Sequence, residues 1–354
     1  MQLNILVLPG DGIGPEVIGE ALRLLRHVAA RYGHNLNLTE GLLGGVAIHK
    51  TGKPFPGETA ALAVDSDATL LGAVGLPEFD TAPPDRRPEK GLLGIRKTLG
   101  VFANLRPVRA YKALLDSSPL KNDIVDGTDM IIVRELTGGI YYGTPRGISG
   151  AGPDERAVNT EVYTRAEIER VARVAFELAR NRRKKLTSVD KSNVLENSQL
   201  WRRVVTELAA EYPDVALDHI LVDNCAMQLI LNPRRFDVLV MPNMFGDILS
   251  DEGAVLAGSI GMLASASIGL YEPVHGSAPD IAGQGKANPL AAIGSVAAML
   301  EYSFGLKDEA AAINRAIEVV LNSGKVTPDL KPAGKPATTS EVGEAVCQAI
   351  DSQP

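Results

Sequence analysis

Apolar runs of strand length alternate along this chain with stretches in which apolar residues recur at helical spacing. Leu3–Leu8 is the first such run, and Val17–Ala30 follows it as a helical stretch. Further apolar runs lie at Met130–Val133, Leu186–Val189 and Phe236–Met241. Strands that alternate with helices usually build a parallel sheet covered by helices. The pattern therefore predicts an α/β fold with a largely parallel sheet.

Local signals mark where some of these elements begin. Pro15 stands at the first position of the first helical stretch, where proline is favoured. Thr164 and Glu167 form a capping box ahead of another amphipathic stretch. Leu200–Leu208 also has helical spacing. The stretch Gly138–Asn159 is rich in glycine and has no helical period, which predicts an arm or an extended hairpin.

Composition is that of a globular protein large enough for two domains. The chain has 354 residues, 45% of them hydrophobic, and its net charge of −7 is spread without long basic runs, which excludes a nucleic-acid-binding surface. Its two cysteines, Cys225 and Cys347, cannot form a disulfide framework. The N-terminus lacks a signal peptide, and no apolar stretch approaches the ~20 residues of a membrane span. We therefore expect a soluble, cytoplasmic protein.

Three aspartates form the first candidate site. Asp247 and Asp251 are four residues apart, so they share one face of a helix. Asp223 ends the apolar run Ala216–Val222, which predicts a strand. Carboxylates that converge from a helix and a strand end suit Mg²⁺ or Mn²⁺, and no neighbouring His or Cys indicates zinc. Spacing alone equally allows Asp247 and Asp251 to be acids at a helix start that face water.

Three arginines are candidates for binding a dicarboxylate. Arg96 and Arg106 lie within Pro88–Val108, and Arg134 directly follows the apolar run at Met130–Val133. A guanidinium group pairs with a carboxylate in bidentate fashion. The alternative for Arg96 and Arg106 is an ordinary surface position. The helix face formed by Glu89, Leu92 and Leu93 would, on spacing alone, pack on a core.

Lys191 and a tyrosine pair are candidates for proton transfer. Lys191 closely follows the run Leu186–Val189. A lysine beside a metal and other cations can have a lowered pKa and act as a base. The alternative is a solvated lysine, and spacing does not choose between Tyr141 and Tyr142.

Two loops suggest cofactor binding to different degrees. Gly10–Glu16 follows a strand and opens a helix, but Pro15 stands where G-x-G-x-x-G requires glycine, so this is not the Rossmann fingerprint. Tyr271–Pro289 contains glycines that allow backbone N–H groups to approach phosphates. Its Asp280 suits a ribose 2′-hydroxyl and would repel a 2′-phosphate.

Together these motifs resemble those of the β-decarboxylating dehydrogenases, and within that family its isopropylmalate-specific branch. The resemblance covers about residues 3–345, through the stretches GDGIGPEV, GLLGIRKTLGVFANLRP, RELTGGIYYG, SVDKSNVLENSQLWR, NMFGDILSD and HGSAPDIAGQGKANP. It implies the isocitrate/isopropylmalate dehydrogenase-like two-domain fold with a mixed, largely parallel sheet, and not a Rossmann fold. The terminal domain would span 1–101 and 255–354. The central domain would span 102–254 and carry the dimer interface and an arm.

The resemblance also implies active sites shared between the subunits of a homodimer. Asp247 and Asp251 of one subunit and Asp223 of the other would hold Mg²⁺ or Mn²⁺. Lys191 would reach the other subunit's site as the base, and Tyr141 would be the acid. The implied substrate-binding residues are Glu89, Leu92, Leu93, Arg96, Arg106, Arg134 and Asp223. The implied NAD-binding residues are Ile13, Asn193, Glu272, His275, Gly276, Ser277, Ala278, Asp280, Ile281, Ala287 and Asn288.

The activity implied by this resemblance is NAD- and metal-dependent oxidative decarboxylation of (2R,3S)-3-isopropylmalate to 4-methyl-2-oxopentanoate and CO₂, a step of leucine biosynthesis. Another 3-alkylmalate or D-malate is the alternative substrate, because one methylene in an apolar pocket discriminates by only ~1–3 kcal/mol. The alternative from another class is a non-catalytic regulatory subunit. Such subunits lose a metal acid, the lysine or the tyrosine, all of which are present here.

The chain departs from the family pattern at a few positions. Leu76 stands where the family usually has glycine, Glu78 where it has a basic residue, and Ala264 where it has proline. Ser267–Tyr271 joins two family motifs with several residues missing. This deletion adjoins the cofactor segment, so we expect it to bear on cofactor affinity.

Overall fold

The computed structural model describes residues 1–353, which form two compact units. One unit contains residues 1–101, 110–122 and those from 257 onward, and the other contains Phe102–Arg109 and Asp123–Leu256. Residues 110–122, which the resemblance assigns to the central domain, thus pack with the terminal segments. The expected division at 101/102 and 254/255 stays a prediction.

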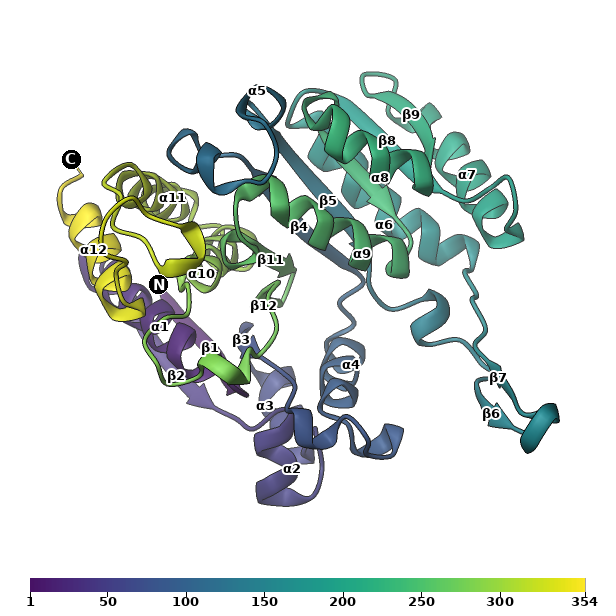
Figure 1. The fold of residues 1–354 in the computed structure, drawn as a ribbon, viewed down its shortest axis with the longest axis horizontal. Helices are drawn as coiled ribbons and strands as arrows, with labels where there is room; N and C mark the ends of the chain where they lie inside the picture. The colour runs from purple at the N-terminus through teal and green to yellow at the C-terminus, as the bar shows by residue number, and fades with distance from the viewer. Residues whose placement is uncertain (354) are drawn as a thin grey trace. The chain divides into compact units, whose positions relative to one another are not determined.

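The first unit builds a mixed sheet from both ends of the chain (Figure 1). In spatial order its strands are β2 (Asn35–Glu40), β1 (Gln2–Gly10), β3 (Ala68–Ala73), β12 (Leu270–Pro273) and β11 (Ala264–Ser267). Neighbours pair in parallel except β11 and β12, which are antiparallel. Leu3, Leu6 and Leu8 are fully buried, as expected for a strand in a sheet covered on both faces.

The helices of this unit cover its sheet. α1 packs against α10 and α12, α10 packs against β11, β12 and β3, and α11 lies against α10 and α12. The helices are α1 (Gly14–Tyr32), α2 (Gly45–Thr51), α3 (Gly57–Asp65), α4 (Pro88–Leu99), α10 (Leu290–Tyr302), α11 (Lys307–Asn322) and α12 (Thr339–Asp351).

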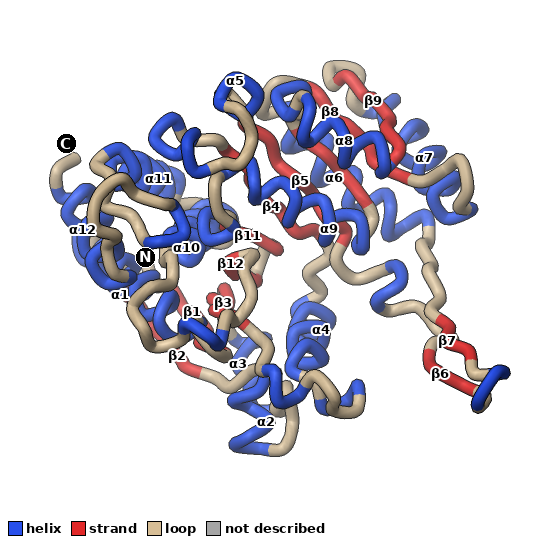
Figure 2. Tube along the Cα trace, in the orientation of Figure 1, coloured by secondary structure: helices blue, strands red, loops and turns tan. Residues whose placement is uncertain are grey.

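The second unit holds a sheet of the same mixed kind (Figure 2). Its strands in spatial order are β4 (Ala103–Arg109), β5 (Asp129–Glu135), β10 (Val238–Met241), β8 (Lys185–Asp190) and β9 (Ala216–Leu221). Only β4 and β5 pair antiparallel. The mixed, largely parallel sheet expected from the sequence is confirmed in both units.

Right-handed crossovers decide which helices of the second unit share a face of its sheet. The chain moves one way along the sheet through α6 and α7 and returns through α8, so α6 and α7 cover one face and α8 the other, where α9 packs beside it. The helices are α5 (Asn122–Val125), α6 (Arg165–Arg180), α7 (Glu196–Leu208), α8 (Val222–Leu231) and α9 (Asn243–Ala254). The hairpin of β6 (Gly147–Ser149) and β7 (Arg156–Val158) projects away from the sheet of its unit (Figure 1).

Several local predictions are confirmed and two are wrong. Pro15 lies in the first turn of α1, the Thr164–Glu167 capping box opens α6, and Gly138–Asn159 contains a hairpin. Asp223 does not end a strand, because β9 stops at Leu221 and Asp223 lies in the first turn of α8. Arg134 does not follow β5 but is part of it. No helix within residues 1–353 is long and apolar enough to cross a membrane.

Candidate active site

Helix α9 carries Asp247 and Asp251 one turn apart and brings them to the strand that carries Arg134. Gly246 makes this approach possible: a Cβ at this position would lie 2.5 Å from Cγ of Arg134. A glycine inside a helix costs roughly 0.5–1 kcal/mol relative to alanine. Here it allows α9 to pack directly on β5, so that an acidic side chain faces a buried arginine.

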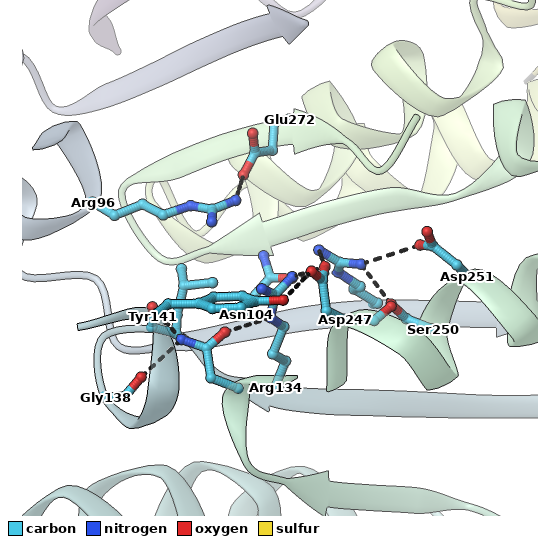
Figure 3. A network of polar contacts seen from close by, with 12 residues as sticks. Arg96, Asn104, Arg134, Gly138, Tyr141, Asp247, Ser250, Asp251 and Glu272 are labelled. Atoms are coloured by element: carbon cyan, nitrogen blue, oxygen red, sulfur yellow. Dashed lines mark hydrogen bonds and ion pairs between the residues drawn. The ribbon is translucent and has the colours of Figure 1, made fainter. Parts of the chain in front are cut away.

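Asp247 accepts contacts from three side chains of the same unit (Figure 3). Its Oδ1 forms a close ion pair with Arg134, and the Tyr141 hydroxyl donates to its Oδ2 at 2.9 Å. A terminal nitrogen of Arg106 lies 3.8 Å from Oδ1 of Asp247, and the other lies 3.7 Å from Oδ1 of Asp251. The structure therefore brings together the expected metal acids, two expected carboxylate-binding arginines and the expected acid.

Burial changes the pKa of two side chains in this cluster. It raises the pKa of Tyr141 above its ordinary value, and the adjacent Asp247 carboxylate adds to the effect. It also raises the pKa of Asp251, against the opposing attraction of Arg106. The Tyr141 hydroxyl thus keeps its proton at neutral pH, as a general acid must before it acts.

Lys191 and Asp223 form a separate pair in the same unit. Nζ of Lys191 donates to Oδ1 of Asp223 at 2.7 Å. This bond holds the pKa of Asp223 below its ordinary value. Within residues 1–353 no group of three or more His, Cys, Asp or Glu side chains is placed to hold a metal. Asp223 therefore does not complete a site with Asp247 and Asp251 of its own chain.

The third arginine is buried in the first unit. Arg96 of α4 donates through Nη2 to Oε1 of Glu272 in β12 at 2.8 Å, and both side chains are buried (Figure 3). Among residues 1–353 the Nε–H of Arg96 has no hydrogen-bond partner. An unmatched donor on a buried guanidinium costs stability unless something accepts from it. Arg96 is therefore suited to receive a further carboxylate.

Helix α4 carries Leu92 and Leu93, the residues expected to contact an apolar group of the substrate. Leu92 and Leu93 are only half-buried and Glu89 is exposed, whereas Ile95 is fully buried. Ile95 makes a core contact of α4, and both the pocket assignment and the core-packing alternative for Leu92 and Leu93 stay predictions. The two leucines remain available for an apolar group of a ligand.

The loop of the first unit that leads from β12 to α10 contains most of the expected cofactor residues, and it is fastened to the loop after β1. Ile13 N–H donates to the Ser277 carbonyl at 2.7 Å. Gly12 has φ +57°, and a Cβ there would lie 2.0 Å from the Ser277 carbonyl oxygen. Glu16 accepts from Gly283 N–H at 3.1 Å. The G-x-G sequence thus serves close loop packing in this chain.

His275 presents an unmatched polar atom in that loop. Its Nδ1–H donates to the Gly276 carbonyl at 2.9 Å, while Nε2 is buried and has no partner among residues 1–353. Burial lowers the pKa of His275, so the imidazole is neutral at pH 7. Its Nε2 is an acceptor that a ligand hydroxyl or amino group fits. Asp280 is exposed in the same loop.

The shortened segment at Ser267–Tyr271 lies away from the cofactor loop. Ile268 and Gly269 form a two-residue turn between β11 and β12, and the Gly269 carbonyl accepts from Thr69 N–H at 2.8 Å. β12 separates this turn from the cofactor loop by four residues, about 13 Å of strand. The deletion tightens the hairpin that ends in β12, and β12 carries the expected cofactor residue Glu272. The expected effect of the deletion on cofactor affinity stays a prediction.

Comparison with known families decides the relationship. The family model described as "Isocitrate/isopropylmalate dehydrogenase" matches residues 4–346 of this chain. The chain belongs to this family.

Relatives named 3-isopropylmalate dehydrogenase are similar throughout. The protein of Halalkalibacterium halodurans is 56% identical over 358 residues, which cover 99% of each chain. That of Aquifex aeolicus is 58% identical over 337 residues, covering 94% of this chain and 93% of its own. A crystal structure of isocitrate dehydrogenase from Methylococcus capsulatus matches with a TM-score of 0.87 and 36% identity, and covers 98% of each chain.

The α9 acids fit the metal requirement of an isocitrate/isopropylmalate dehydrogenase. Asp247 and Asp251 present only carboxylate oxygens, the donors that Mg²⁺ and Mn²⁺ prefer. Their arginine partners belong to β4 and β5 of the same unit. The arrangement can hold a cation beside a carboxylate-bearing substrate.

Sequence reasoning missed residues that support this site. Asn104 accepts from Nε of Arg106 at 2.7 Å, and Ser250 accepts from another of its nitrogens. Asn104 lies two residues before Arg106 in the strand, hence on the same face. Ser250 lies in α9 between the two acids. Period-two spacing from Arg106 would have pointed to Asn104, and i, i+3 spacing from Asp247 to Ser250. Asn243 lies four residues before Asp247 and so had a spacing signal as well, whereas Gly246 had none.

Proposed function

We propose that the chain catalyses oxidative decarboxylation of (2R,3S)-3-isopropylmalate to 4-methyl-2-oxopentanoate and CO₂, using NAD⁺ and Mg²⁺ or Mn²⁺, as a cytoplasmic step of leucine biosynthesis. The observation that carries the proposal is the grouping of Arg106, Arg134 and Tyr141 around Asp247. Full-length identity above half to relatives named 3-isopropylmalate dehydrogenase supports the choice of substrate.

Each side chain has a role that its surroundings support. Arg96, Arg106 and Arg134 bind the malate carboxylates. Lys191 takes the proton of the 2-hydroxyl, and Tyr141, kept protonated by its raised pKa, gives a proton to the enol carbon after CO₂ has left. When bound, NAD⁺ supplies the hydride acceptor, and the divalent cation supplies positive charge beside the 2-hydroxyl and the developing enolate.

We assign NAD⁺ binding to the loop of the first unit that leads from β12 to α10. The residues that line it in our proposal are Ile13, Glu272, His275, Gly276, Ser277, Ala278, Asp280, Ile281, Ala287 and Asn288, with Asn193 of the second unit on the nicotinamide side. The unmatched Nε2 of His275 and the exposed carboxylate of Asp280 support a contact with an unphosphorylated ribose.

A homodimer is supported by surfaces that a single chain leaves uncovered. Residues 144–159 are exposed throughout, and Ile148 of β6 is 73% exposed. An isolated two-stranded hairpin is at best marginally stable in water, so pairing with the same arm of a second copy is a natural way to cover it.

Helices α8 and α9 of the second unit also expose apolar side chains, and these lie near candidate active-site residues. Met227 and Leu231 of α8 are 55% and 63% exposed, and Ile248 of α9 is 59% exposed. Asp223, Met227 and Leu231 follow one another at i, i+4 spacing, so they share one face of α8. A partner that covers the apolar residues of α8 also meets Asp223. We therefore assign Asp223 and Lys191 to the site of the partner subunit.

A substrate and cofactor panel tests the activity. We expect NADH formation from 3-isopropylmalate with Mn²⁺ present, and kcat/KM for NADP⁺ at least about tenfold below that for NAD⁺, because Asp280 repels a 2′-phosphate. kcat/KM would be measured for D-malate, isocitrate and a 3-alkylmalate series. Isocitrate or D-malate as the best substrate would contradict the substrate assignment. An NADP⁺ preference would contradict the role of Asp280.

The α4 leucines give a second test of the substrate. Leu93→Ala is expected to lower kcat/KM for isopropylmalate by roughly five- to 150-fold, equivalent to ~1–3 kcal/mol of lost apolar contact. D-malate, which lacks the isopropyl group, should lose much less. Leu62→Ala, at another half-buried leucine of the same unit, is the control and should leave both values unchanged. Equal losses for both substrates after Leu93→Ala would remove the leucine from the pocket.

A further inference from the structure

Asn243 is a buried amide at the start of α9 whose side chain makes three hydrogen bonds. The residue is 1% exposed. Its Oδ1 accepts from Nε of Arg134 at 3.0 Å, and its Nδ2 donates to the carbonyls of Leu136 and Gly138 at 3.1 and 3.0 Å. One amide therefore joins α9, the arginine of β5 and the loop that follows β5.

The loop held by Asn243 leads directly to Tyr141. Figure 3 draws Gly138 and Tyr141 on this loop beside Arg134. The Gly138 peptide is held from both sides, because its N–H donates to buried Glu135 at 2.8 Å while its carbonyl accepts from Asn243. Gly139 follows at φ +72°, where a Cβ would lie 2.4 Å from the hydroxyl oxygen of Tyr163. That hydroxyl in turn accepts from Asn243 N–H at 2.8 Å.

Asn243 also fixes the orientation of the Arg134 guanidinium. Asn243 and Asp247 lie one turn apart on α9 and contact the same arginine, the first at Nε and the second at a terminal nitrogen. A planar guanidinium held at two of its nitrogens cannot rotate freely. Its direction toward an incoming carboxylate is then set by α9.

We propose that Asn243 is a positioning residue, which sets the guanidinium of Arg134 for the substrate carboxylate and the loop that presents the Tyr141 hydroxyl. This inference rests on the roles assigned above to Arg134 and Tyr141. Asparagine suits the position because it combines one acceptor with two donors. An aspartate side chain keeps the acceptor for Arg134, but it places an oxygen that cannot donate against the two carbonyls. An alanine side chain makes none of the three hydrogen bonds.

Asn243→Ala and Asn243→Asp separate the two halves of this role. We expect Asn243→Ala to lower kcat and raise KM for isopropylmalate, with a combined loss of about ten- to a hundredfold in kcat/KM. Asn243→Asp should lower kcat by about tenfold while KM stays within about threefold of the wild-type value, because only the loop contacts are lost. Thr187→Val, at a buried hydroxyl of β8 in the same unit without a partner among residues 1–353, is the control and should keep both parameters.

Double-mutant cycles distinguish positioning from general support of the fold. If Asn243 acts through Tyr141 and Arg134, then adding Asn243→Ala to Tyr141→Phe should lower kcat by less than about threefold, and adding it to Arg134→Lys should raise KM by less than about threefold. Losses that multiply in full would overturn the inference, as would near-normal kinetics of Asn243→Ala. If Asn243→Ala does not fold, Asn243→Asp is combined with Tyr141→Phe under the same kcat criterion. Full activity of Tyr141→Phe and Arg134→Lys would instead refute the site assignment itself.

Discussion

Replacing Asp247 by asparagine is expected to reduce turnover of isopropylmalate by at least about a thousandfold while the fold stays intact. The amide keeps the shape and one of the two acceptor oxygens that face Arg134 and Tyr141, but it removes the negative charge that a hard divalent cation requires. Loss of that cation removes a stabilisation of several kcal/mol from the developing enolate. Turnover, the unfolding temperature and Mn²⁺ binding by titration calorimetry would be measured together.

Two controls frame this result. EDTA should abolish wild-type activity, and added Mn²⁺ should restore it. Asp126→Asn changes an exposed aspartate of the same unit and should bind Mn²⁺ and turn over like the wild type. Sustained turnover by EDTA-treated, metal-free protein would exclude the metal requirement. Normal Mn²⁺ affinity of Asp247→Asn would exclude Asp247 as its ligand.

Mixing two inactive variants is expected to restore about a quarter of wild-type activity. Lys191→Ala alone lacks the base, and Asp247→Asn alone lacks a metal ligand. In a heterodimer with composite sites, one site carries both lesions and the other carries neither. Random exchange makes about half of the dimers heterodimers, each with one good site of two. Activity would be followed during exchange, with heterodimer formation checked by native mass spectrometry.

The matched negative control is a mixture of Lys191→Ala with Asp223→Asn. Both changes lie on the same contributing surface, since Lys191 Nζ bonds to Asp223 Oδ1. Every heterodimer site then carries one lesion, so activity should stay at the level of the separate variants. If the first mixture forms heterodimers yet stays inactive, each site is built within one chain. Recovery in the control mixture would contradict the placement of Lys191 and Asp223 on one side.

The periodic pattern was sufficient to predict several of the helices and strands, because these are stabilised by interactions between residues that are close in sequence. The capping box at Thr164 depends on two side chains three residues apart, and it forms as predicted. The end of β9 was misjudged because Val222 is apolar and β-branched, so it extends the strand pattern. It is nevertheless helical, and Asp223 follows it in the first turn of α8.

The candidate site was likewise only partly predictable from the sequence. Spacing correctly grouped Asp247 with Asp251, since one helical turn separates them. Asn243 has the same spacing, four residues before Asp247, but its partners Leu136 and Gly138 lie more than a hundred residues earlier, so spacing did not reveal its role. Hydrogen bonds between residues so distant in sequence depend on how β5 and α9 pack. The resemblance to a family named Arg134 and Tyr141, but not Asn243, the amide that we propose as their positioning residue.

By itself the sequence determined the α/β class, several of the elements, the family and the set of chemically competent side chains, because these depend on local spacing and on motif identity. Only the tertiary structure decided which groups meet. It brought Tyr141, Arg106 and Arg134 to Asp247, paired Arg96 with Glu272, and set Asp223 on the exposed apolar face of α8 beside Lys191. These contacts join separate strands and helices, and the free energy that forms them comes from packing the sheets and helices as a whole.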